Sequence, residues 1–508
     1  MLQSGVPRLS TTLARPSPGF RNGNAALPTM PLRPSHPLKN AVRLALLPIL
    51  AALACSATAS VLAPVTPPPP LLAGQAPRSG NPILPGYYAD PTVLAYQGHA
   101  YIYATIDPWG GDTLGCWESP DFRNWTYHTL NWPTKRACTS PTSLGAMVWA
   151  PSVLRGRDGK FHMVVSVGSE IWAGVADNPL GPWRNTLGNR PMIPANFRPG
   201  YHMIDAELFL DDDGQAYVYW GSGWNWVNGR CWAAKLKPDM ATLDGPVHDV
   251  TPAHYFEAPI LVKRHGLYFL LYSAGKTTED TYCVRYAMGK TPFGPFVEGA
   301  NSPILSTHRS ENIVSPGHNG ILHLGGRDYI LYHRQSIPFD PRFIGRQVCI
   351  DPIVFTAQGQ IHAVVPSHAG PSLVQGRDEA TSLAFGAHAT ASTCGPHTRA
   401  GFAVDDNYAT RWSAAPGSHG AWLQLDLGRE VRFARQDLRF EYAWKSYRFM
   451  LESSPDGRHW TAVADFTRQP ATGSPVQIDA AGTARYLRLV FPDAPKAPIP
   501  SLFEWSVH

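Results

Sequence analysis

The chain has 508 residues, of which 44% are hydrophobic and 16% are charged. Because a single core rarely serves this length, two or three domains are expected, and the composition excludes a wholly disordered protein. Residues 1–60 hold six of the 43 basic residues and no acid, which leaves 37 basic and 38 acidic residues in the remainder. Without a basic body, the chain is not expected to bind nucleic acid.

Residues 1–60 have the pattern of a signal or targeting segment. Arg33, Lys39 and Arg43 precede an apolar run at 44–54, which small residues follow. The run is too short to span a bilayer, so no transmembrane segment is expected. We expect a secreted or periplasmic protein, with a lipoprotein anchored at Cys55 as the alternative. In an oxidising compartment the six later cysteines are candidates for disulfides, and Cys116 with Cys138 is the most local pair.

A Pro-rich linker at 61–80 leads into a region that repeats one pattern. In each repeat, a turn containing Gly is followed by an alternating aromatic strand. The pattern occurs five times, and its key glycines are Gly98, Gly159, Gly214, Gly266 and Gly326. Their spacing of 52 to 61 residues is that of β-propeller blades. The sequence therefore predicts a five-bladed, all-β propeller over residues 81–370.

A second β region follows a short linker at 371–384. Residues 385–508 lack the earlier repeat but contain alternating strands such as "WLQLDLG" (422–428). A segment of about 125 residues with this pattern suits a β-sandwich.

Polar and aromatic residues stand at matched positions in the five repeats. They lie eight to ten residues before the key glycine, and they are Asp90, Trp149, Asp205, Glu257 and His318. Equivalent positions in a propeller form a ring around one axis, so these side chains are expected to converge. Carboxylates that converge in an aromatic cleft have separated pKa values, which suits one to act as base and another as acid.

Each of these residues also has a structural interpretation when it is taken alone. Asp90 before a proline is typical of a turn, Glu257 and His318 are compatible with hydrogen-bonded core groups, and Trp149 with packing between blades. The matched spacing of three acids favours the functional interpretation. Motifs of serine hydrolases, zinc proteases and P-loop proteins do not occur in the sequence. Paired carboxylates with aromatic platforms are typical of glycoside hydrolysis.

At these residues the sequence resembles glycoside hydrolase family 43, an inverting family built on a five-bladed β-propeller. The ordered motifs are "NPILPGYYADP", "WAPS", "IDAELFLDDDG", "EAPILVKRHGLYFLLYS", "PGHNG" and "GRQVCIDPIVF". The resemblance implies that Asp90 is the general base, that Glu257 is the general acid and that Asp205 tunes the pKa of the acid. It further implies substrate contacts for Trp149, Arg346 and His318. No cofactor is expected for the chemistry, and a structural calcium ion is expected on the propeller axis.

The C-terminal region resembles a coagulation factor 5/8 type C (discoidin-like) domain. The motifs are "AVDDNYATRW", "WLQLDLG", "YRFMLESSPDGRHW", "ARYLRLVF" and "FEW". Such modules often bind glycans and hold a structural calcium ion, for which Asp405, Thr410 and Glu504 match the usual side chains. Asp406 stands where the family has Gly, which places the geometry of that loop in question.

The expected function is release of terminal sugars from plant-type polysaccharide side chains, with α-L-arabinofuranosidase as the first choice. The alternatives are a β-xylosidase, an endo-arabinanase and a galactan- or galactofuranose-directed enzyme. Alternatives of another class are a propeller lectin without catalysis and a cell-surface adhesion protein. An oligo- or polysaccharide is the expected partner, and the sequence does not indicate the oligomeric state.

Overall fold

The computed structural model describes residues 80–376, 382–494 and 497–508. The signal segment, Cys55 and residues 61–79 of the linker expected at 61–80 lie outside these residues. Regular structure in the described residues is almost entirely β, as expected. The only helices described are three short 3₁₀ segments, η1 (Arg309–Glu311), η2 (Ser372–Val374) and η3 (Ala400–Ala403).

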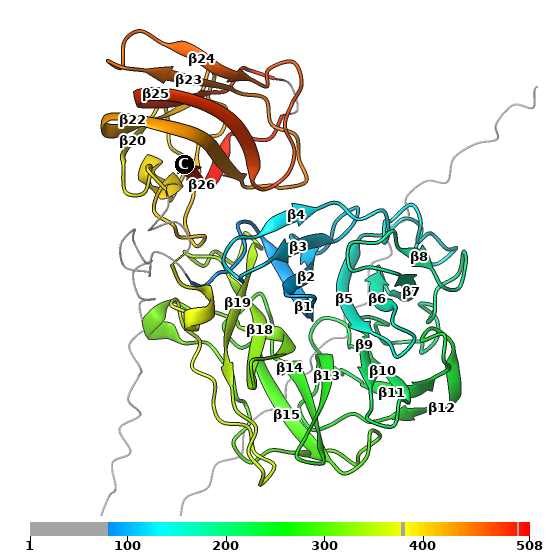
Figure 1. Ribbon diagram of the computed structural model, residues 1–508. Coiled ribbons are helices and arrows are strands. Elements are labelled where there is room, and N and C mark those ends of the chain that lie inside the picture. The colour runs from blue at the N-terminus through cyan, green and yellow to red at the C-terminus, as the bar shows by residue number, and fades with distance from the viewer. Residues whose placement is uncertain (1–79, 377–381, 495–496) are drawn as a thin grey trace, which may run out of the picture. The chain divides into compact units, whose positions relative to one another are not determined.

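Five small antiparallel sheets form the blades of a propeller, which confirms the predicted architecture (Figure 1). The first blade contains β1 (Tyr88–Tyr96), β2 (His99–Ile106), β3 (Gly115–Ser119) and β4 (Thr126–His128). The second contains β5 (Val148–Arg155), β6 (Phe161–Val167), β7 (Glu170–Ala176) and β8 (Arg184–Asn185). The third contains β9 (Glu207–Leu210), β10 (Ala216–Trp220), β11 (Trp232–Leu236) and β12 (Leu243–Asp249).

The fourth blade contains β13 (Glu257–Arg264), β14 (Leu267–Ala274), β15 (Cys283–Gly289) and β16 (Val297–Glu298). The fifth contains β17 (Gly317–Leu324), β18 (Arg327–Gln335) and β19 (Arg346–Ile353). The first strand of each blade contacts the first strand of the next, and β17 contacts β1, so these five strands form a closed inner ring.

The residues just before β1 close the ring by pairing with the last blade. The Ile83 amide donates to the Val348 carbonyl oxygen at 2.9 Å, and the Asn81 side chain bonds to both backbone groups of Ile350. Because Asn81 is 3% exposed, its hydrogen bonds to Ile350 are shielded from water. The "NP" at the start of the first motif therefore completes the fifth blade.

Packing between the blades is apolar and aromatic and includes buried cysteines. All six cysteines in the described residues are free thiols, so Cys116 and Cys138, the most local candidate pair, do not form a disulfide. Both side chains are fully buried in one hydrophobic cluster between the first two blades. Burial raises the pKa of Cys138 to about 12, which keeps the thiol protonated and unreactive.

The C-terminal region forms one strongly bent sheet around its own core, consistent with the expected discoidin-like sandwich. Its strands are β20 (His388–Ala391), β21 (Trp412–Ser413), β22 (Trp422–Phe440), β23 (Met450–Ser454), β24 (Thr461–Asp465), β25 (Val476–Val490) and β26 (Ser501–Val507). The long strands β22 and β25 pair along most of their length, with register shifts that allow them to bend.

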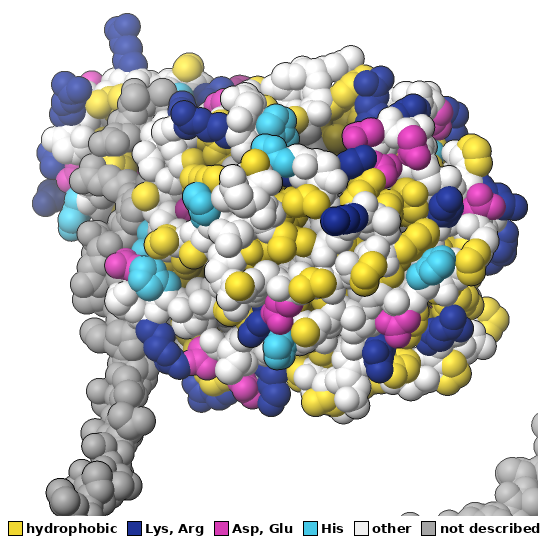
Figure 2. All heavy atoms as spheres, turned by 90° about the horizontal axis from the view of Figure 1, so that it is seen from below, with side chains coloured by type: hydrophobic (Ala, Val, Ile, Leu, Met, Phe, Trp, Pro, Cys, Tyr) yellow, Lys and Arg dark blue, Asp and Glu magenta, His cyan; other side chains and the backbone are white. Residues whose placement is uncertain are grey.

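The surface of the molecule carries both signs of charge. Figure 2 shows a face on which Lys and Arg side chains are interspersed with Asp and Glu, without an extended patch of one sign. That face gives nucleic acid no electrostatic footprint. Within the described residues, no helix is long and apolar enough to cross a bilayer.

Candidate functional site

Four inner strands contain a β-bulge at the same point, and all five blades place a left-handed residue there. The pairing register shifts after Ala89, Trp149, Glu257 and Gly317. The left-handed residues, with φ between 44° and 57°, are Asp90, Ala150, Asp205, Ala258 and His318. A bulge redirects side chains locally, and here it turns them toward the propeller axis. Trp149 and Glu257 directly precede their left-handed residue, which accounts for part of the variation in their distance from the key glycine.

Side chains on the second strand of four blades support these bulges. Each accepts a hydrogen bond from a left-handed residue of the following blade. The pairs are Ala150 N to Thr105 Oγ1 (2.8 Å), Asp205 N to Ser166 Oγ (3.0 Å), His318 N to Ser273 Oγ (2.9 Å) and Asp90 N to His333 Nδ1 (3.3 Å). A left-handed residue other than Gly persists only when its surroundings determine it, and these bonds do so.

Asp90 is 2% exposed and sits among donors and cations. Thr105 Oγ1 donates to its Oδ2 at 2.7 Å, and Arg346 Nη1 donates to its Oδ1 at 3.0 Å. His318 Nδ1 lies 3.2 Å from the same Oδ1. Burial alone would raise the pKa of Asp90, but the Arg346 charge and His318 hold it well below its usual range. Asp90 is therefore ionised at neutral pH.

Arg346 is held by a second acid, Asp107, which lies at the end of β2. Arg346 Nη2 lies 2.7 Å from Asp107 Oδ1, and Arg346 Nε lies 3.0 Å from Asp107 Oδ2. The Arg346 backbone amide also donates to Oδ2 at 2.7 Å. Such a bidentate pair fixes the plane of the guanidinium. Arg346 lines the cavity, and its expected contact with substrate stays a prediction.

Asp205 and Glu257 form the opposite electrostatic environment. Desolvation and the Glu257 and Asp90 carboxylates raise the pKa of Asp205, although His318 opposes the shift. Desolvation also raises the pKa of Glu257, and a hydrogen bond from Tyr282 partly opposes it. Because the pKa of Asp205 is raised to about 8, this pair of acids retains a proton at neutral pH.

Two histidines beside Asp90 differ in charge. Burial would lower the pKa of His318, but the carboxylates of Asp90 and Asp205 raise it to about 9, so His318 is cationic at neutral pH. Burial and the Arg346 charge lower the pKa of His333 to about 3, so His333 is neutral. Its Nδ1 accepts the Asp90 amide, and its Nε2 lies 3.3 Å from Thr277 Oγ1.

These groups line a cavity of about 210 Å³ with aromatic walls. The aromatic lining residues are Trp109, Trp149, His202, Trp224, Trp226 and Phe256. Trp149 is fixed by a 2.9 Å hydrogen bond from its indole nitrogen to the Gly168 carbonyl oxygen. The Trp224 ring stacks on His202 with centroids 4.0 Å apart, yet it remains 48% exposed. The cavity is smaller than a typical drug-sized site and suits one monosaccharide.

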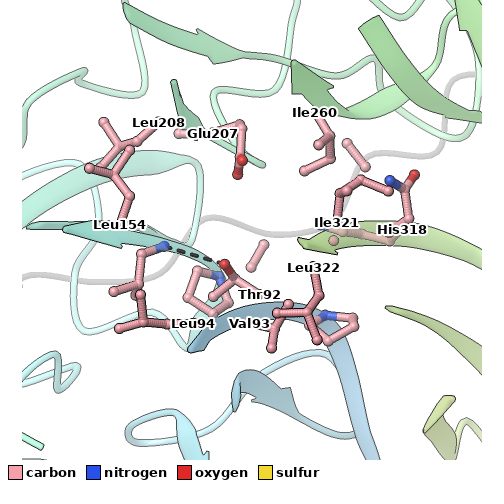
Figure 3. Close-up of a pocket in the computed structure, with 18 of the residues that line it drawn as sticks. Thr92, Val93, Leu94, Leu154, Glu207, Leu208, Ile260, His318, Ile321 and Leu322 are labelled. Carbon is pink, nitrogen blue, oxygen red and sulfur yellow. Dashed lines mark hydrogen bonds between the residues drawn. The ribbon is translucent and has the colours of Figure 1, made fainter. Parts of the chain in front are cut away.

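A second cavity, of about 320 Å³, lies further along the inner strands (Figure 3). Asp205 and His318 border both cavities, so the ring of bulges separates them. Figure 3 shows the Glu207 carboxylate directed into a space surrounded by side chains such as Leu94, Leu154 and Ile260. Asn319, which also lines the cavity, is fully buried, and its amide has no hydrogen-bond partner.

The Glu207 carboxylate and the Asn319 amide are the oxygen donors that the expected axial calcium would find. Calcium takes six to eight oxygen ligands, so water would have to supply most of them. Within the described residues, no group of three or more His, Cys, Asp or Glu side chains is placed to hold a metal ion. These donors fit a calcium ion that keeps most of its water ligands, and they do not fit an ion coordinated by protein groups alone.

In the C-terminal domain the three expected metal ligands flank one loop. Thr410 Oγ1 donates to Asp405 Oδ2 at 2.8 Å, and the Asp406 amide donates to Glu504 Oε2 at 2.9 Å. Asp406 has φ of 52°, so it adopts the left-handed conformation of the glycine that the family has there. Burial and the neighbouring Asp406 raise the pKa of Asp405 to about 7. Asp405 is half-buried, and its carboxylate oxygens are of the type that calcium prefers.

The spacing of the repeats predicts the ring of side chains and does not reveal the residues that support it. Trp149, Asp205, Glu257, His318, Arg346 and Asp90 all line one cavity. The missed residues are Thr105, Asp107, Ser222, Tyr282, His333 and the platforms Trp109 and Trp224. A signal existed for Asp107, because "IDP" ends an aromatic strand just as "ADP" begins one.

Comparisons with known proteins agree with this geometry. Residues 79–361 match glycosyl hydrolases family 43, and residues 388–505 match the F5/8 type C domain. The β-D-galactofuranosidase xynD of Aspergillus niger is 33% identical over 56% of this chain and 84% of that protein. The arabinoxylan arabinofuranohydrolase of Bacillus subtilis is 26% identical over 58% of this chain and 65% of that protein. A solved structure titled "Glycoside hydrolase" is 27% identical, with a TM-score of 0.72, over 85% of this chain and 100% of that one.

Proposed function

Because the chain belongs to glycoside hydrolase family 43, we propose that it removes single terminal furanosyl residues from oligo- or polysaccharides. The family and the curated relatives make it a glycoside hydrolase. The observation that carries the proposal is the pair of opposite carboxyl environments in one small cavity. The Arg346 charge holds the pKa of Asp90 well below its usual range, and desolvation raises the pKa of Glu257.

The proposed reaction is a single displacement. Asp90 removes a proton from water as the water oxygen attacks the anomeric carbon. Glu257 donates its proton to the glycosidic oxygen as the bond from that oxygen to the anomeric carbon breaks. Asp205 keeps the pKa of Glu257 high, and His318 positions Asp90 and Asp205. In an inverting enzyme the two catalytic carboxyl groups are about 6.5–9.5 Å apart, which leaves room for the water.

Two terminal furanosides fit the proposed site. α-L-Arabinofuranose is the first candidate, and the 33% identity to a protein named β-D-galactofuranosidase favours β-D-galactofuranose as the second. The two sugars share the configuration of the furanose ring and differ in the exocyclic chain at C4. A cavity of about 210 Å³ with exposed Trp224 at its wall favours removal of one sugar over binding of a long chain.

A panel of aryl glycosides tests this proposal. We expect the wild-type protein to release the aryl group from α-L-arabinofuranosides or β-D-galactofuranosides. On an alkyl furanoside of the preferred sugar, we expect Glu257→Gln to be far slower than the wild type. Preferred cleavage of β-D-xylopyranosides would indicate a xylosidase instead. Binding of glycan without release from any glycoside would favour the lectin or adhesion alternatives.

Calcium is proposed as a structural ion, with no part in the displacement. Glu207 and Asn319 would hold it in the axial cavity, and Asp405, Thr410 and Glu504 in the C-terminal domain. An ion bound only by the folded protein raises the melting temperature. Added calcium should therefore raise the melting temperature of the chelator-treated protein, and Glu504→Gln should reduce that gain. An unchanged melting temperature would contradict the proposal.

Export is proposed from residues 1–60 alone. Expression of the full chain in a bacterial host should yield a mature N-terminus after the apolar run at 44–54. Recovery of uncleaved protein from the cytoplasm would contradict this expectation.

A further inference from the structure

Tyr282 lies directly behind the proposed general acid. It is 1% exposed and does not line the catalytic cavity. Its ring stacks on His333, with centroids 5.7 Å apart and planes 6° apart. A Cβ atom at Gly317 would come within 2.2 Å of the ring, so only Gly leaves room for Tyr282 at this position. The phenol is therefore held firmly in one place.

A one-way chain of hydrogen bonds ends on Glu257. The His318 backbone amide, which can only donate, donates to Ser273 Oγ at 2.9 Å. The Ser273 hydroxyl keeps its own hydrogen, and it acts on the phenol of Tyr282. Burial raises the pKa of Tyr282 well above its usual range, and the Ser273 hydroxyl opposes this shift. The phenol stays neutral and donates its own hydrogen to Glu257 Oε1 at 2.7 Å.

The second oxygen of Glu257 faces a hydroxyl that has two possible acceptors. Ser222 Oγ lies 3.3 Å from Glu257 Oε2 and 3.2 Å from the Gly223 carbonyl oxygen. While Oε2 carries a proton, the Ser222 hydroxyl can donate to the carbonyl and accept from Oε2. Once the proton leaves, the same hydroxyl can turn and donate to Oε2. Ser222 thus suits both protonation states of this oxygen.

We propose that Tyr282 is a positioning residue that reserves Oε2 of Glu257 for the transferable proton, with Ser222 stabilising that oxygen after transfer. Oε1 is the acceptor oxygen because the neutral Tyr282 phenol donates its hydrogen to it. The proton therefore leaves from Oε2 to the glycosidic oxygen, and that oxygen keeps the electron pair of the breaking bond to carbon. This inference rests on the proposed role of Glu257 as general acid.

The test compares Tyr282→Phe with wild type on two furanosides of the preferred sugar. On an alkyl furanoside, whose leaving group needs a proton, kcat/KM should fall about ten- to hundredfold, because the proton is then shared between both oxygens. On a 2,4-dinitrophenyl furanoside it should change little. The alkaline limb of the pH profile should move to higher pH, because ionised Glu257 loses a hydrogen-bond donor.

Tyr103→Phe is the matched control. Tyr103 is fully buried in the first blade, and its hydroxyl donates to the Pro179 carbonyl oxygen at 2.7 Å. This variant should lose a similar buried hydrogen bond and leave both the leaving-group dependence and the pH profile unchanged.

Equal losses on both furanosides with an unmoved alkaline limb would overturn the proposal and leave Tyr282 a structural role. If Tyr282→Phe does not fold, Ser222→Ala provides the second test. Ser222→Ala should also move the alkaline limb to higher pH, and kcat/KM should fall more on the alkyl than on the dinitrophenyl furanoside. An equal fall in kcat/KM on both substrates would again overturn the proposal. Absence of hydrolysis by the wild type would be a failure of the proposed function instead.

Discussion

The surroundings of Asp90 and those of Glu257 differ although both carboxyl groups line one cavity. Asp90 has a guanidinium, a cationic imidazole and a threonine hydroxyl on its two oxygens. Glu257 has two neutral hydroxyl groups, from Tyr282 and Ser222. Desolvation acts to raise the pKa of both acids. The neighbouring cations outweigh it at Asp90, whose pKa is lowered, and not at Glu257, whose pKa is raised. Arg346 and His318 lower the pKa of both acids, but Asp90 is the acid that they contact.

This difference fixes the expected pH dependence of kcat/KM. Activity requires Asp90 ionised, so it is lost as the pH falls through a pKa well below the usual value of 3.8. Activity requires a proton on Glu257, so it is lost as the pH rises through the raised pKa values of the Asp205–Glu257 pair. The alkaline limb should be the one visible in the range where the protein is folded.

Removal of the carboxylate at Asp90 should have the largest effect. Asp90→Asn cannot accept the proton of water, so kcat/KM should fall about 10²–10⁴-fold with both alkyl and 2,4-dinitrophenyl furanosides. Kinetics on the two substrates at one pH measures this loss. A loss confined to the alkyl substrate would indicate that Asp90 is the general acid and not the general base.

Glu257→Gln should separate the two substrates. The alkyl furanoside needs a proton on its leaving oxygen, so its kcat/KM should fall by a similar factor of about 10²–10⁴. The dinitrophenyl furanoside leaves without protonation and should lose less than about tenfold. Equal losses on both substrates would contradict the role of Glu257 as acid.

Arg346→Gln would remove one of the two cations that contact Asp90 and leave the other, His318. Without the guanidinium the pKa of Asp90 should rise, and the acid limb should move up by about one to three pH units. Because Asp107 would keep a buried charge without its partner, the free energy of unfolding should also fall by about 3–5 kcal/mol. Kinetics across pH and urea unfolding check both effects, and an unmoved acid limb would contradict the account.

Asp107→Asn should give the smallest change in activity. Any shift of the acid limb should be opposite to that of Arg346→Gln. Arg346 would keep its contact with Asp90 and lose a competing anion, so the acid limb should stay or move to lower pH. The loss in kcat/KM should be about tenfold or less, because only the orientation of Arg346 is weakened. An upward shift of the acid limb would show that Asp107 acts in another way.

The sequence was sufficient to predict the ring of polar residues because a propeller repeats one local pattern. Counting back from Gly98, Gly214 and Gly266 leads to Asp90, Asp205 and Glu257, and all three line the cavity. Counting residues does not reveal the bulge. It therefore treats Asp90, which is the left-handed residue, and Glu257, which precedes one, as equivalent positions.

The supporting residues could not be found in the same way. Ser273 and His333 act on the following blade, and Tyr282 lies before the third strand of its own blade, outside the repeated hairpin. Their contacts depend on how blades pack, which no local pattern encodes. Cys116 became a disulfide candidate for the same reason, because the sequence indicates export and does not show that this thiol is buried between blades.

The anomeric form of the first product tests the central claim most directly, because an ionised Asp90 is chemically able to act as a base or as a nucleophile. Proton NMR during the first turnovers, before the free sugar equilibrates, distinguishes the two roles. If Asp90 activates water while Glu257 protonates the leaving oxygen, the released furanose should have the inverted configuration. Release of the retained anomer would make Asp90 a nucleophile and contradict the account.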